Sequence, residues 1–137
     1  MTTAVNAPPE DVWRLFTDLE RWPELTGSIR EVRRLDSGPL RVGSEAVVRQ
    51  PGLPRARWRV TDLEPGQSFT WTTSAAGVTT AADHVVRADG NGSVIIITLR
   101  QHGPLAPLIG ALTGHRTRRY VAMELEGFRR EAEAARS

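Results

Sequence analysis

Between residues 29 and 101 this sequence consists of short β-type segments that are separated by turns rich in glycine and proline. Examples of such turns are Glu64-Pro65-Gly66 and Asp89-Gly90-Asn91-Gly92. Short strands at this spacing, with these turn residues between them, are typical of an antiparallel meander. We therefore predict six strands in succession, at residues 29–36, 44–50, 57–63, 68–74, 78–87 and 93–101.

A short strand and two short helices are expected before the meander. Residues 2–6 favour a strand, and Pro8-Pro9-Glu10-Asp11 then suits a first helical turn, where proline is tolerated and carboxylates face the positive helix end. Trp22-Pro23 belongs to a second helical turn, because the residue before a proline resists continuing a helix. The first helix has one apolar face, built from Val12, Leu15, Phe16 and Leu19.

After Gly103-Pro104 the pattern predicts helix to the C-terminus, with two apolar stripes on opposite sides. Gly110 and Gly114 lie between the stripes, and glycine weakens a helix interior by about 1 kcal/mol relative to alanine. We predict a short helical piece, a break between these glycines, and a long helix from about residue 113. The first stripe contains Leu105, Ile109 and Leu112, and the second contains Val121, Leu125, Phe128 and Ala132.

The second stripe loses its bulk toward the start of the helix. Extended backwards, it meets Thr117, Gly114 and Gly110, which are small residues. We therefore expect a core that is full at one end of the long helix and hollow at the other. In addition, the short piece before Gly114 is expected to move as a lid over the hollow end.

The length of 137 residues predicts a single α+β domain over residues 1–137. Hydrophobic residues make up 39% of the chain and charged residues 25%, values that exclude a disordered chain. No apolar run reaches the 18 residues of a membrane span, and the N-terminus has no basic-then-apolar leader. The expected location is the cytoplasm.

Missing residue types exclude several kinds of catalytic site. The chain has no cysteine, and all 18 of its basic residues are arginine. Cysteine nucleophiles, Schiff-base lysines and the lysine of a phosphate-binding loop are therefore excluded. The three histidines, at positions 84, 102 and 115, do not have the spacing of a zinc site, so we expect neither a protein-bound metal nor a cofactor.

The alternation of strand residues assigns a set of side chains to the inner face of the sheet. His84 lies between Ala82 and Val86 on this face, where it either moves or donates a proton or packs as a structural residue. Asp83 must point to the other face, so the two residues cannot form a dyad. Trp58 and Trp71 either stack on a flat ligand or fill the core. Three further inward residues either orient a ligand or mark strand ends: Gln50, Thr73 and Gln101.

The order of strand, two small helices, six-stranded meander and long helix resembles the helix-grip fold of the START/Bet v 1-like (SRPBCC) superfamily. Within it, the sequence is most similar to the polyketide cyclase/dehydrase and lipid-transport group. The resemblance covers nearly the whole chain and rests on Ala7-Pro8-Pro9-Glu10-Asp11-Val12-Trp13, Trp22-Pro23-Glu24, Gly43, the segment from Trp58 to Gly66, Phe69-Thr70-Trp71, His84 and Gly92. It implies a curved antiparallel sheet of about seven strands wrapped around the C-terminal helix.

The resemblance also implies a cavity between the sheet and this helix, the usual site for a hydrophobic small molecule. From the helix, we expect Thr117, Tyr120, Val121 and Glu124 to line it. A lipid-, polyketide- or aromatic-like ligand is the first functional hypothesis. A cyclase/aromatase-like enzyme, with His84 or Tyr120 moving protons, is the second. The predicted ligand-binding residues are Gln50, Trp58, Phe69, Trp71, Thr73, His84, Leu99, Gln101, Thr117 and Tyr120.

A third hypothesis, a ribosome- or RNA-associated module, rests on the arginines of the C-terminal helix. Arg116, Arg119 and Arg130 fall on the face opposite the second apolar stripe. Glu126, Glu131 and Glu133 interrupt this row, and acidic neighbours at helical spacing form ordinary ion pairs with arginine. The net charge of +2 is small. Both observations favour a solvated face over a nucleic-acid site.

Overall fold

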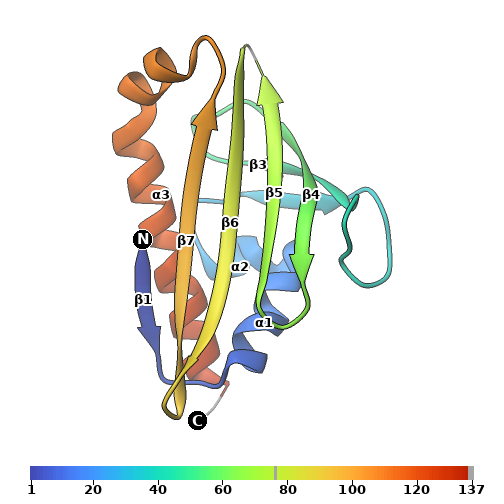
Figure 1. Ribbon diagram of the computed structural model, residues 1–137, viewed down its shortest axis with the longest axis vertical. Coiled ribbons are helices and arrows are strands. Elements are labelled where there is room, and N and C mark those ends of the chain that lie inside the picture. Colours follow the sequence, from blue (N-terminus) through green and yellow to red (C-terminus); the bar gives the residue numbers. More distant parts are fainter. Residues whose placement is uncertain (76, 136–137) are drawn as a thin grey trace.

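The computed structural model describes residues 1–75 and 77–135, which form one seven-stranded antiparallel sheet and a long C-terminal helix (Figure 1). In chain order the elements are β1 (Thr2–Val5), α1 (Pro9–Thr17), the 3-10 helix η1 (Leu19–Arg21), α2 (Trp22–Leu25), β2 (Glu31–Arg34), β3 (Glu45–Arg49), β4 (Ala56–Glu64), β5 (Ser68–Ala75), β6 (Val78–Asp89), β7 (Gly92–His102) and α3 (Ala106–Ala134).

The strand order in the sheet is β1-β7-β6-β5-β4-β3-β2, so the six predicted strands form a continuous meander. β1 closes the far edge by pairing with β7, with Thr3 opposite Ile95. β2 is shorter than the predicted residues 29–36, although the backbone N–H groups of Arg30 and Leu35 still donate to carbonyls of β3. The predicted helix-grip fold, with short helices after the first strand, is confirmed.

α1 and α2 cover one end of the sheet with the apolar residues that the sequence pattern predicts. Val12 and Phe16 of α1 are fully buried, and Leu19 of η1 is nearly so. The indole Nε1 of Trp22 donates to the carbonyl oxygen of Leu15 at 3.0 Å, which ties α2 to α1. The two small helices are therefore held together and close this end of the core.

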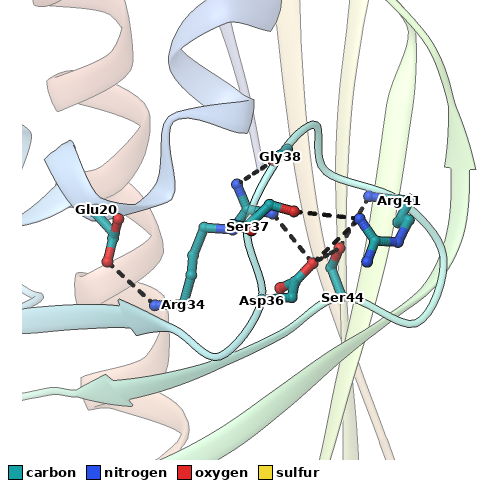
Figure 2. A network of polar contacts seen from close by, with 7 residues as sticks. All are labelled: Glu20, Arg34, Asp36, Ser37, Gly38, Arg41 and Ser44. Carbon is teal, nitrogen blue, oxygen red and sulfur yellow. Dashed lines mark hydrogen bonds and ion pairs between the residues drawn. The ribbon is translucent and has the colours of Figure 1, made fainter.

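A polar network holds the long connection between β2 and β3 (Figure 2). Asp36 accepts a hydrogen bond from the Ser44 hydroxyl at 2.8 Å and pairs with Arg34 and Arg41 at 3.3 and 3.7 Å. Arg34 also donates to the Gly38 carbonyl at 2.8 Å. These contacts lie within one connection and the strand ends that flank it, so the network fixes the shape of the loop.

α3 is one uninterrupted helix of 29 residues, and the predicted break between Gly110 and Gly114 is wrong. Both glycines lie inside the helix, because a cost of about 1 kcal/mol for each is small beside the hydrogen bonds of so long a helix. The two apolar stripes are therefore both present on one helix. The second packs on the sheet, whereas the leucines of the first are left exposed.

The four tryptophans and three phenylalanines form one connected aromatic network in the core. Phe128 brings α3 into it, with its ring 5.0 Å from that of Phe16 and 5.5 Å from that of Trp22. Aromatic side chains bury large areas, so this network gives the core most of its bulk near α1 and α2. The first half of α3 adds no residue to the buried core cluster.

Candidate functional site

The inner face of the sheet changes from aromatic to polar along the length of β5, β6 and β7. Three rows of paired side chains run across these strands. The row that begins at Phe69 is buried. The row that begins at Trp71 is buried except at Leu99, and the row that begins at Thr73 is partly exposed. A ligand that lay along this face would therefore meet an apolar end and a polar end. The rows are Phe69–His84–Ile97, Trp71–Ala82–Leu99 and Thr73–Thr80–Gln101.

A pocket opens between β7 and the first half of α3, with a volume of about 330 Å³. The sheet supplies Ile97, Leu99 and Gln101 to its lining, and α3 supplies Gly114 and Thr117. Small residues on α3 leave this space open, Val121 borders it, and Leu125 and Phe128 fill the corresponding space further along the helix. The pocket therefore lies where the second apolar stripe loses its bulk.

Two charged or polar groups complete the lining of this pocket. Arg118 reaches it from α3, and Met1, the residue before β1, reaches it from the edge of the sheet. The N-terminal amine of Met1 donates to the Ile97 carbonyl oxygen at 2.7 Å, so the chain terminus is fixed against β7. Neither residue could be predicted from the sequence, because Arg118 lies at the edge of the apolar stripe and Met1 precedes an edge strand that is distant in the sequence.

Glu124 is an acidic residue on the inner side of α3. It follows Tyr120 by one helical turn and precedes Phe128 by another, so the three side chains lie along the same side of the helix. Within the described residues its carboxyl group has no hydrogen bond and no ion pair, and burial raises its pKa to about 7. A carboxyl group in this state can either donate or accept a proton near neutral pH.

His84 lies inside the aromatic network. Its ring stacks on Phe69 at 4.5 Å with an interplanar angle of 5°, and Trp22 lies 5.4 Å away. Neither ring nitrogen has a hydrogen-bond partner among the described residues, and burial lowers the pKa of the imidazole to about 4. His84 is therefore neutral at pH 7, enclosed by hydrocarbon, and outside the lining of the pocket.

Asp83 points to the outer face of the sheet, as the strand alternation predicts. Its carboxylate accepts hydrogen bonds from the Thr70 hydroxyl at 2.6 Å and from the Arg100 guanidinium at 2.9 and 3.0 Å. The two adjacent residues thus have separate environments. No dyad between Asp83 and His84 is formed.

The remaining predicted site residues lie on the side of the core toward β3 and β4. Trp58 is half-buried and packs on Trp71, with 5.2 Å between ring centroids. The Gln50 amide donates to the Ser28 carbonyl oxygen at 3.3 Å. The Tyr120 hydroxyl donates to the Pro51 carbonyl oxygen at 2.5 Å, which connects α3 to the loop between β3 and β4. Gln50 and Tyr120 therefore support the walls of the interior.

The structure brings together only part of the predicted ligand-binding set. Leu99, Gln101 and Thr117 line the pocket between β7 and α3. Phe69, Trp71 and His84 belong to the aromatic network, and Thr73 lies with Thr80 and Gln101 in the polar row. Tyr120 and Glu124 were expected in the lining, but neither borders the pocket, and the unpartnered carboxyl group of Glu124 was not foreseen. The sequence feature that indicates burial of this carboxyl group is the position of Glu124 between Val121 and Leu125 of the second apolar stripe.

A second groove, of about 400 Å³, lies on the other side of α3. Leu25 and Gly27 border it on one side, and Arg119, Met123 and Arg130 border it on the helix. The Arg130 guanidinium donates to the Leu25 carbonyl oxygen at 3.2 Å and partly bridges the groove.

Within residues 1–75 and 77–135, no three histidine or carboxylate side chains gather in a way that would hold a metal ion. In the same residues, no helix combines the length and apolar character needed to cross a membrane.

The family profile described as polyketide cyclase / dehydrase and lipid transport matches residues 1–133. No curated protein matches the chain. Among solved structures, a hypothetical protein from Helicobacter pylori is similar with a TM-score of 0.82 and 12% identity, over 96% of this chain and 85% of that one. At these identities, the likeness to solved structures concerns the fold.

Two further structural neighbours are proteins with named activities. Truncated norcoclaurine synthase from Thalictrum flavum has a TM-score of 0.73 and 16% identity, over 93% of this chain and 88% of that one. The di-domain ARO/CYC StfQ from the steffimycin biosynthetic pathway has a TM-score of 0.69 and 20% identity, over 97% of this chain and 45% of that one. Both share the arrangement of a curved sheet and a long helix with this chain.

Proposed function

The chain belongs to the polyketide cyclase / dehydrase and lipid transport family, and from this premise we propose that it binds a hydrophobic small molecule between the sheet and α3. The observation that carries the proposal is the pocket between β7 and the first half of α3. Its volume of about 330 Å³ falls within the range of small-molecule sites. Family membership and the pocket both support this proposal.

The lining of the pocket supports a ligand with an apolar body and a polar end. Ile97, Leu99 and Val121 offer hydrocarbon, whereas Gln101 and Thr117 offer hydrogen-bonding groups. Arg118 adds a positive charge at the edge, which favours an acidic or strongly hydrogen-accepting group on the ligand. A lipid-like or polyketide-like molecule has this combination of parts.

The proposal is tested by filling the pocket with a larger side chain. Thr117→Trp places an indole where the lining is small, so it should abolish binding without unfolding the protein. In a packed core the same change would cost about 1–3 kcal/mol of stability. A matched control is Ala111→Trp, which adds the same group at an exposed position of α3.

Binding is measured by native mass spectrometry of freshly purified protein and by titration with the dye 1-anilinonaphthalene-8-sulfonate. The expected result is a bound mass or bound dye in the parent and in Ala111→Trp, and its loss in a folded Thr117→Trp protein. A Thr117→Trp protein that melts at a temperature lowered by the amount a packed site implies would contradict the pocket. Equal binding by the parent and Thr117→Trp would do so as well.

A cyclase-like activity is the second candidate, and Glu124 is the observation that favours it. Glu124 lies outside the pocket lining, about one helical turn beyond Val121, so its carboxyl group, with a pKa of about 7, would serve as an acid or base toward a polyketide-type chain that extends past Val121. The fold is shared with a protein described as an ARO/CYC di-domain. Glu124→Gln should then remove turnover of a poly-β-ketone substrate by about 10²–10⁴-fold and leave its binding intact. A parent protein that binds this substrate but does not turn it over would leave only the carrier function.

His84 has a structural role in this proposal. Its ring nitrogens are enclosed in the aromatic network, away from the pocket lining. His84→Ala should therefore reduce stability and leave ligand affinity per folded molecule unchanged. A folded His84→Ala protein that binds its ligand but has lost a demonstrable cyclisation activity would assign the proton transfer to His84 instead.

A further inference from the structure

The first turns of α3 carry an apolar surface that faces solvent. Leu105 at the helix start is 43% exposed, Leu108 is 56% exposed and Leu112 is 73% exposed. They are three of the six large hydrophobic residues that are exposed in the described part of the chain. A scattered exposed leucine needs no explanation, but three within eight residues of one helix form a patch.

The patch lies on the side of α3 that faces away from the sheet. At 100° per residue, Leu108, Leu112 and Arg119 fall within about 40° of one another. Val121, which packs in the core, lies on the opposite side of the helix. In Figure 1 these first turns lie at the upper end of the molecule, far from α1. The patch therefore remains free when the second apolar stripe packs on the sheet.

The charge around the patch has one sign. Residues 101–123 contain no aspartate or glutamate, whereas they contain Arg116, Arg118 and Arg119. Within the described residues none of these three arginines forms an ion pair. Further along α3 the situation is different, since Arg129 pairs with both Glu126 and Glu133.

We propose that this face of α3, formed by Leu105, Leu108, Leu112 and Arg119 with Arg116 beside them, docks on the surface of a membrane that contains anionic lipids. Leucines that insert at the level of the headgroups and arginines that meet lipid phosphates are the two components of interfacial binding by an amphipathic helix. The docking does not rest on the proposed ligand-binding function. The pocket residues Gly114 and Thr117 lie on the opposite side of the same helix, so a docked α3 would stand between the pocket and the bilayer.

The charge of the patch favours an anionic membrane over a second copy of this chain or RNA as its partner. A second copy of this chain, paired about a two-fold axis through the patch, would bring the same unpaired arginines near one another, which is unfavourable. RNA would use the arginines but would gain nothing from three exposed leucines, because phosphate contacts are electrostatic. An anionic bilayer is complementary to both parts of the surface.

The test is flotation of the full chain with vesicles of phosphatidylcholine alone and with vesicles that contain phosphatidylglycerol as well. We expect binding to the anionic vesicles and little to the neutral ones. The double variant Leu108→Gln/Leu112→Gln should weaken this binding by about tenfold or more for each leucine. Arg119→Gln should weaken it by about fivefold, and higher salt should reduce binding of the parent.

Matched controls remove the same side chains elsewhere on the surface. Val42→Gln replaces another exposed apolar residue, in the β2–β3 connection, and Arg87→Gln replaces an exposed arginine of β6. Both should bind anionic vesicles as the parent does. Circular dichroism verifies that each variant is folded, so a loss of binding reports on the surface.

Three results would overturn the proposal. The first is no binding of the folded parent to anionic vesicles. The second is a parent that is dimeric by light scattering, becomes monomeric in Leu108→Gln/Leu112→Gln and does not bind vesicles, which would assign the patch to a second copy. The third is tight RNA binding that depends on Arg119 but not on the leucines, together with no vesicle binding.

Discussion

His84 is enclosed in the core and Glu124 is half-buried on α3, and neither side chain has a charged partner on the same face. His84 has its pKa lowered to about 4 by burial, and Glu124 has its pKa raised to about 7 by the same cause. Burial disfavours the charged form of both groups, so the shifts have opposite directions. His84 is therefore neutral above about pH 4, and Glu124 is neutral below about pH 7.

Glu124 should make the protein less stable as the pH rises. Its folded pKa of about 7 exceeds the ordinary value of 4.5, so its contribution is complete below pH 4.5 and is lost as the pH rises through 7. The loss amounts to roughly 2–3 kcal/mol. Glu124→Gln should remove this pH-dependent loss. In urea unfolding, the stability of the variant relative to the parent should therefore be higher at pH 7.5 than at pH 5.

Glu126→Gln is the control for this measurement. Glu126 is exposed and pairs with Arg129, whose hydrogen bond lowers the pKa of Glu126. Its removal should not produce a relative gain at high pH. If Glu124→Gln and Glu126→Gln responded alike, the carboxyl of Glu124 would have to be solvated.

His84 should have the opposite effect on acidification. Its contribution is complete above pH 6.5 and is lost as the pH falls toward 4, because the unfolded chain takes up a proton that the folded chain excludes. The loss at pH 5 is about 2 kcal/mol. His84→Leu should abolish this loss in urea unfolding between pH 7 and pH 5, whereas His102→Leu, at an exposed position, should retain it.

For single residues, the sequence predicts the face on which a side chain lies better than it predicts the groups that the side chain contacts. Strand alternation places His84 on the inner face, and desolvation alone predicts a neutral imidazole. What encloses the ring could not be foreseen, because Phe16 and Trp22 arrive from helices far away in the sequence. For Glu124, helical spacing gives the side of the helix, but the absence of a partner depends on how α3 sits over the sheet.

At the level of elements, α3 shows why a change of apolar stripe does not require a break. The predicted break follows only if both stripes are buried, because a straight helix of 3.6 residues per turn cannot bury both on one sheet. The helix instead continues through Gly110 and Gly114, and Leu108 and Leu112 stay in solvent. The strands were predicted more closely, since turn residues mark their ends directly.

The glycines of α3 should differ in their response to alanine. A Cβ at Gly114 would find its nearest neighbour, the tip of Arg118, at 3.7 Å, which is ordinary contact. Gly114→Ala should therefore stabilise the protein by about 0.5–1 kcal/mol through the reduced entropy of the unfolded chain. At Gly127 a Cβ would lie 2.3 Å from the backbone oxygen of Leu25.

Gly127→Ala should accordingly destabilise the protein, because the α2 backbone must move away from α3 to admit the methyl group. Thermal and urea unfolding of the two variants beside the parent measure both effects. A stabilising Gly127→Ala would show that the close approach of α3 to α2 is not maintained. A destabilising Gly114→Ala would show that the helix is strained at that point.

At the scale of the whole molecule, the packing is uneven along its long axis. The aromatic network and the helices α1 and α2 fill one end, whereas the first half of α3 has exposed or partly exposed residues and borders the pocket. The sequence predicts this gradient, because Gly110, Gly114 and Thr117 continue the bulky stripe with small residues. It does not predict the outline of the pocket, which depends on Met1, a residue distant in the sequence, and on the distance between α3 and the sheet.

This gradient should appear in amide hydrogen exchange. Residues 106–116 of α3 have few buried contacts, so their amides should exchange faster than those of residues 121–128, which pack in the core. Two hydrogen bonds hold the first half of α3 to the β3–β4 loop, from Tyr120 to the Pro51 carbonyl and from Arg116 to the Gly52 carbonyl. Tyr120→Phe removes the first of them. It should speed exchange in residues 106–116 and in the loop while leaving residues 121–128 unchanged, and a uniform rate along α3 in the parent would contradict a mobile end beside the pocket.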